Sequence, residues 1–147
     1  MKKLVLIALA LAAAYFGGIQ GGFISRQRDA GSTATSGAEQ ALVAAFANRR
    51  SNVQVQASGQ VTRVLPDDNE GSRHQRFIVR LPSGQTVLVA HNIDLADRVA
   101  ALKTGDSIEF YGEYEWNERG GVVHWTHRDP QHGHVAGWIK HNGQTYQ

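Results

Sequence analysis

The chain has 147 residues, contains no cysteine and carries a formal net charge of +2. The lack of cysteine excludes a disulfide framework, a thiolate zinc site and a cysteine nucleophile. Lys2 and Lys3 account for the whole positive excess, so the rest of the chain is balanced in charge. Nucleic acid is therefore a ligand that the charge does not favour, because nonspecific binding depends on neutralised phosphates.

The first 24 residues have the pattern of an export segment. Lys2 and Lys3 precede an apolar run over residues 4–24, in which Gln20 is the one strongly polar side chain. A basic start followed by an apolar run is typical of a secretory signal peptide, while about 20 apolar residues are also enough to cross a bilayer as a helix. A cleaved signal peptide and an uncleaved inner-membrane anchor both stay open. Both predict an exported, periplasmic protein, and the second gives it the membrane as a partner through residues 4–24.

Residues 25–37 are rich in Ser, Thr, Gly and Ala, a composition that predicts a flexible linker. Residues 38–147 are then the folded domain. Its first segment, 38–50, places Leu42, Ala45 and Phe46 on one apolar stripe at helical spacing, which predicts a helix.

Alternation of apolar and polar residues then predicts five strands. We expect them at 53–62, 74–81, 86–92, 108–116 and 122–127. A loop is expected at 66–71, and Asp94 is expected to cap a helix that continues to Leu102.

This order indicates an all-β domain with short helices. We expect a five-stranded, OB-like Greek-key barrel with an N-terminal helix and a helix between strands 3 and 4. Gly59 and Gly112 interrupt the first and fourth strands, where a small closed sheet needs to coil sharply. A small open β-sandwich is the alternative.

Two stretches carry a resemblance to a known family. They are HQRFIVRLPSGQTVLVAHNIDLADR, which begins at His74, and GDSIEFYGEYEWNERGGVVHWTHRDPQHGHVAGWIKHNGQTYQ, which begins at Gly105. Over residues 52–147 the chain resembles an uncharacterised bacterial family of small exported proteins, domain of unknown function 3465. The resemblance implies a compact OB-like domain and assigns no catalytic residue.

The C-terminal part is rich in histidine, the commonest protein ligand of transition metals. We take His91, His124, His127, Asp129 and His134 as candidate ligands of a divalent transition metal such as zinc. Two other interpretations stay open: histidines that bond structurally to the backbone or to Asp129, and histidines that transfer protons.

A second set of residues is a candidate ligand surface. Tyr111 shares its predicted strand face with glutamates, whereas Tyr114 and Trp116 share theirs with Phe110 and belong to the core. The full candidate set for ligand binding is His74, Arg76, Arg80, His91, Asn92, Tyr111 and Trp125.

Three functions are compatible with these features. The first is an exported binding module that recognises a small ligand, an oligosaccharide, a peptide or nucleic acid. The alternative is a metal- or histidine-dependent hydrolase with its site at the end of the histidine-rich fifth strand. The third is a structural protein of the cell envelope.

Overall fold

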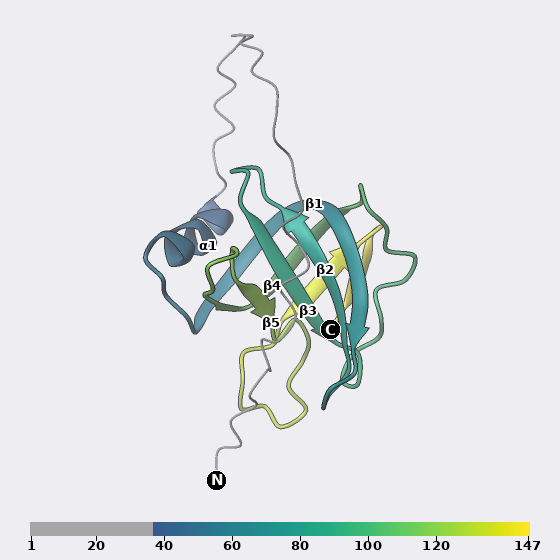
Figure 1. The fold of residues 1–147 in the computed structure, drawn as a ribbon. Helices are drawn as coiled ribbons and strands as arrows, with labels where there is room; N and C mark the ends of the chain where they lie inside the picture. Colours follow the sequence, from purple (N-terminus) through teal and green to yellow (C-terminus); the bar gives the residue numbers. More distant parts are fainter. Residues whose placement is uncertain (1–36) are drawn as a thin grey trace. The chain divides into compact units, whose positions relative to one another are not determined.

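The computed structural model describes residues 37–147, and the expected export segment and residues 25–36 of the expected linker lie outside that range. The described part has one helix and seven strands, and Figure 1 shows how they are arranged. They are α1 (Gly37–Ala47), β1 (Val53–Asp68), β2 (His74–Arg80), β3 (Thr86–Asn92), β4 (Ser107–Glu115), β5 (Val122–His124), β6 (Trp138–His141) and β7 (Gln144–Tyr146). No helix between residues 37 and 147 is long and apolar enough to cross a membrane.

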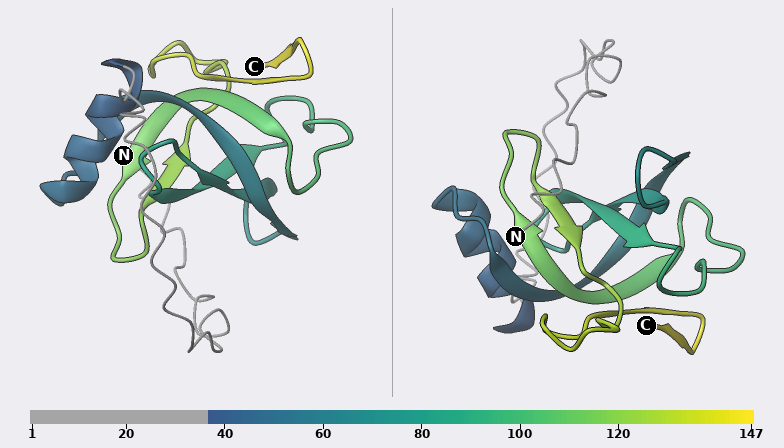
Figure 2. Two further views of the ribbon diagram at one scale, coloured as in Figure 1. Left: turned by 90° about the horizontal axis from the view of Figure 1, so that it is seen from above. Right: turned by 90° about the horizontal axis from the view of Figure 1, so that it is seen from below.

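Five of the strands close into a ring. The order around it is β1-β2-β3-β5-β4, and β4 pairs again with β1. The long strand β1 makes this closure possible, because residues 53–60 pair with β4 and residues 60–68 pair with β2. The β6–β7 hairpin lies outside the ring alongside β4, as Figure 2 shows. The expected all-β class is therefore confirmed.

The interior of the ring follows from the alternation in the strands. Phe77, Phe110 and Tyr114 are fully buried, and Leu42 of α1 joins the same cluster. The predicted helix is present but ends at Ala47 rather than at residue 50, since Arg49 has a φ of 52° and leaves the helical conformation. Burial of these large apolar groups is the main favourable contribution to folding.

Gly59 and Gly112 lie where two strands approach each other closely. A Cβ atom on Gly59 would stand 2.3 Å from the carbonyl oxygen of Arg80, and one on Gly112 would stand 2.4 Å from that of His124. Any other residue would force the strands apart, so both positions require glycine. This agrees with the sharp coiling expected there.

The predicted helix between strands 3 and 4 is wrong. Residues 93–106 form turns and irregular backbone, with Leu95 45% exposed. The carboxylate of Asp94 accepts bonds from the backbone N and Nε of Arg73 instead of capping a helix. The buried side chain of Gln75 bonds both backbone groups of Val99, which satisfies them without a helix.

The ends of two strands and one hairpin also differ from the prediction. The expected loop at 66–71 is wrong at its start, because β1 continues to Asp68 through a register shift after Leu65. The expected fifth strand stops at His124 instead of residue 127, because Trp125 has a φ of 54°. The β6–β7 hairpin was not predicted, although Asn142-Gly143 at its turn is a typical hairpin signal.

Candidate metal centre

One face of β4 is lined by polar side chains. Phe110 and Tyr114 point into the core, so Glu113 and Glu115 lie on the opposite, half-buried face. Gln54 of β1 lies opposite Glu113 on one side, and His124 of β5 lies opposite Glu113 on the other. The strand pairing therefore sets Glu113 between an amide and an imidazole.

Glu113, Glu115 and His124 form a cluster of three metal-ligating groups. One donor atom from each lies within 4.8 Å of the other two. Nε2 of His124 is 3.6 Å from Oε1 of Glu113 and 3.7 Å from Oε1 of Glu115. These separations exceed hydrogen-bond length. His124 therefore faces both glutamates but forms no hydrogen bond to either through Nε2.

His124 and Gln54 leave polar atoms unsatisfied at this place. Nε2 of His124 and Nε2 of Gln54 are buried and have no hydrogen-bond partner among the described residues. An unsatisfied buried polar atom costs about 1–3 kcal/mol and calls for an explanation. An ion between the imidazole and the two carboxylates would supply the missing partner for His124.

The protonation states suit such an ion. Burial lowers the pKa of His124, which keeps its imidazole neutral and its lone pair available. Burial, together with a side-chain hydrogen bond to Glu113, raises the pKa of Glu115. Two neighbouring carboxylates repel each other when both are charged, and a divalent cation bound between them removes that repulsion.

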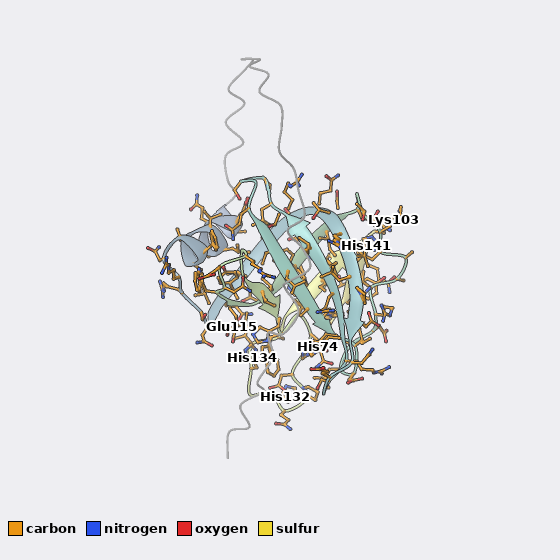
Figure 3. All side chains as sticks on the ribbon, viewed as in Figure 1. His74, Lys103, Glu115, His132, His134 and His141 are labelled. Atoms are coloured by element: carbon orange, nitrogen blue, oxygen red, sulfur yellow. The ribbon has the colours of Figure 1, made fainter. Side chains whose placement is uncertain are left out.

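His134 contacts the second carboxylate oxygen of Glu113. Its Nε2 lies 2.6 Å from Oε2 of Glu113, and its Nδ1 lies 2.9 Å from the carbonyl oxygen of Val135. Both ring nitrogens therefore face oxygen acceptors, which fixes the orientation of the imidazole ring. The ring stacks on Trp125, with centroids 4.1 Å apart and planes 9° apart. Figure 3 shows His134 on the same side of the molecule as Glu115.

Asp129 shapes the segment that carries His134. Its carboxylate accepts hydrogen bonds from the backbone N of Gln131, Gly133 and His134. Backbone N of Gly137 also bonds the carbonyl oxygen of His127. These hydrogen bonds fix the conformation of the turn after β5, which brings His134 back to the face of β4.

The predicted metal ligands fall into two groups. His124 and His134 meet at Glu113, whereas His91, His127 and Asp129 make other bonds. His91 is fully buried, with Nδ1 2.8 Å from Oγ1 of Thr126 and Nε2 3.0 Å from the carbonyl oxygen of Asp97. Both its nitrogens are therefore used, and burial lowers its pKa to about 4. Nδ1 of His127 lies 2.7 Å from the carbonyl oxygen of Arg128, and the ring packs near Trp125.

The predicted ligand-binding residues do not form one surface. His74 and Asn92 are paired across β2 and β3, where each bonds nearby backbone groups. Arg76 donates two bonds to the carbonyl oxygen of Pro66. Tyr111 packs against Trp138, with ring centroids 6.0 Å apart. Arg80 lines a separate recess formed by β1, β2, β4 and the β6–β7 turn. Trp125 stacks on His134.

Glu113 and Glu115 were missed by the sequence reasoning. The signal was available in the expected hairpin, because a turn at residues 118–121 places Glu113 opposite His124 and Glu115 opposite Val122. The spacing of the histidines along the chain does not report which residues lie opposite them across the strands.

The family comparison covers most of the chain. A family model described as "Protein of unknown function (DUF3465)" matches residues 27–147. No curated protein matches the sequence. The match includes every described element, together with the glutamates of β4 and the histidines that follow it. This chain therefore belongs to the DUF3465 family.

Proposed function

We propose that the protein is an exported, periplasmic binding module whose domain is an OB-like Greek-key barrel. The five-stranded ring with its parallel β3–β5 pairing supports the barrel architecture. Lys2 and Lys3 before the apolar run 4–24 support export, either with a cleaved signal peptide or with an anchor in the inner membrane.

The ligand that the geometry supports best is a divalent transition metal such as zinc, held by Glu113, Glu115 and His124. The observation that carries this proposal is the buried, unpartnered Nε2 of His124 facing two carboxylates. Two ligand atoms on one tetrahedral zinc stand about 3.3 Å apart, since Zn–N and Zn–O distances are about 2.0–2.2 Å. The observed separations of 3.6 and 3.7 Å need only a small adjustment to meet that value.

The residues around the cluster fit the same role. His134 fixes one oxygen of Glu113 and leaves the other directed toward His124. Outer hydrogen bonds of this kind orient ligands and are a regular part of metal sites. Two carboxylates and one neutral imidazole are ligands of the type that zinc, iron, nickel and copper accept.

A metal-dependent hydrolase is the second candidate. The observation that favours it is the number of ligands, because three protein groups leave a coordination position for water. Metal-bound water is acidic enough to act as a nucleophile near neutral pH.

Titration calorimetry of the full-length protein in mild detergent tests the metal proposal. We expect one Zn²⁺ per chain, and loss of that binding in Glu113→Gln, Glu115→Gln and His124→Gln variants. Glu118→Gln is the matched control, because Glu118 is an exposed carboxylate in the neighbouring turn. Undiminished zinc binding in the His124 variant would show that the ion binds elsewhere. Hydrolysis of generic ester and phosphoester substrates that is lost with the metal would support the second candidate.

A further inference from the structure

A recess lies apart from the metal cluster, at the opposite end of β4. It has a volume of about 600 Å³ and is formed by the middle of β1, the start of β4, the end of β2 and the β6–β7 turn. In Figure 3 His141, which lines this recess, lies well apart from Glu115 and His134. Volumes of this size are typical of sites for small ligands.

The walls of the recess are fixed by the fold. Nε2 of His141 lies 2.8 Å from Oδ2 of Asp106, which ties β6 to the segment before β4. Asn142 and Gly143 make the turn with φ values of 49° and 76°. On the opposite wall, Gly59 admits the backbone of Arg80 at close range. Because the fold already fixes these residues, they lose little conformational entropy when a ligand binds.

Two cations face the recess without a carboxylate partner. Arg80 and Lys140 are exposed, and neither forms an ion pair with any residue in the described range 37–147. Nζ of Lys140 stands 4.3 Å from the ring centroid of Trp138, which positions the ammonium group beside the recess. The recess therefore offers two sites for a negatively charged group of a ligand.

The other polar groups of the recess include acceptors as well as donors. Glu109 receives a hydrogen bond on Oε1 from Gln56 at 2.8 Å, which orients its carboxylate. The amide nitrogen of Gln60 donates to the carbonyl oxygen of Gly105 at 3.2 Å, so its oxygen is available as an acceptor. Ser58 and Ser107 add hydroxyl groups that both donate and accept.

We propose that this recess binds a short acidic oligosaccharide, with a sugar carboxylate on Arg80 and Lys140 and sugar hydroxyls on Glu109, Gln60 and the serines. A phosphate group needs only donors, and the carboxylate of Glu109 would repel its second charge. Sugar hydroxyls need acceptors and donors together, which is the mixture that lines the recess. The site shares no residue with the metal cluster.

Binding of a digalacturonate probe to the full-length protein, measured by calorimetry, tests this proposal. We expect it to bind at least tenfold more tightly than the neutral digalactose. Arg80→Gln and Lys140→Gln should each weaken binding about tenfold or more, because hydrogen bonds to charged groups contribute the most. Arg119→Gln, which changes an exposed arginine in the β4–β5 turn, should have no effect.

Glu109→Gln separates sugar acids from phosphates. The variant should weaken digalacturonate binding, because it removes an acceptor for hydroxyls, and it should strengthen any binding of inorganic phosphate. Equal affinity for the neutral sugar, unchanged affinity in both cation variants, stronger competition by phosphate or no binding at millimolar probe would each overturn the proposal. Identical sugar binding with and without EDTA would show that the recess acts independently of the metal cluster.

Discussion

Glu113 and His124 occupy opposite positions in the β4–β5 pairing, with 3.6 Å between Oε1 and Nε2. Nε2 of His124 is too distant to donate a hydrogen bond to the carboxylate, and this atom is buried from solvent. The two side chains therefore leave a place for a metal ion between them, and binding of that ion can be measured.

The affinity for zinc should fall as the pH falls. Burial and Glu113 raise the pKa of Glu115 above its ordinary value, so Glu115 takes up a proton and stops ligating at a higher pH than a free carboxylate would. The pKa of His124 is lowered, so its imidazole stays neutral to a lower pH than that of an ordinary histidine. Calorimetry at a series of falling pH values should show a loss of affinity that begins above the pH at which an ordinary glutamate takes up its proton. An affinity that stays constant down to that pH would contradict the proposed ligand set.

Replacing Asp129 with alanine should weaken zinc binding about tenfold, which is the low end for residues that orient metal ligands. The carboxylate holds three backbone amides of the turn that carries His134, so its loss frees the partner of Glu113. The ring NMR signals of His134 should shift at the same time. Asp68→Ala is the control, because it removes a similar turn hydrogen bond, to backbone N of Glu70, in a different loop. Equal losses in both variants would rule out the positioning role.

Gly112→Ala should destabilise the fold by about 1–3 kcal/mol, the usual cost of forcing extra atoms into a packed region. The new methyl group would meet the carbonyl oxygen of His124 at 2.4 Å and Cγ1 of Val123 at 3.0 Å. Because β5 must move away, zinc affinity should fall as well. Gly37→Ala meets nothing within 4 Å and should leave both unfolding and zinc binding unchanged. Urea unfolding and calorimetry measure the two effects.

His91 should make the domain less stable in mild acid. Its pKa is about 4 in the folded protein and 6.5 in the unfolded chain, so the unfolded state binds the proton more tightly. The contribution is therefore complete above pH 6.5 and decreases as the pH falls toward 4, with a loss of about 2 kcal/mol between pH 7 and pH 5.

Urea unfolding of wild type and a His91→Gln variant at these two pH values measures the contribution of His91. The variant should lose less stability than wild type on acidification. His132→Gln, which changes an exposed histidine, should behave as wild type does. An equal loss in wild type and the His91 variant would show that other histidines cause the acid sensitivity.

The sequence predicted the strands well because two-residue alternation directly reports which side chains are buried. Val55, Phe77, Val89 and Phe110 all lie in the core, and the glycines of β1 and β4 lie at close strand contacts. The helix at 94–102 failed because tertiary bonds decide that segment. The side chain of Gln75, far away in sequence, forms hydrogen bonds with the backbone N and O of Val99. No local sequence pattern predicts such bonds.

The candidate site was predictable only in part. Histidines near the end of the fifth strand were visible as metal-ligating groups, and His124 and His134 do meet at Glu113. The burial of His91 and the turn-forming role of Asp129 depend on neighbours that the folded chain supplies. Glu113 and Glu115 become ligand candidates only once the register of β4 and β5 is known.

The edge of β4 that faces away from β1 is divided between two strands, with β5 along residues 113–115 and β6 along residues 109–111. A single nine-residue strand thus forms the floor under the glutamate–histidine cluster at one end and under part of the sugar recess at the other. A substitution that loosens this strand should impair both binding activities together. Both sites would lose affinity because both depend on β4, and no allosteric coupling between the two ligands is needed.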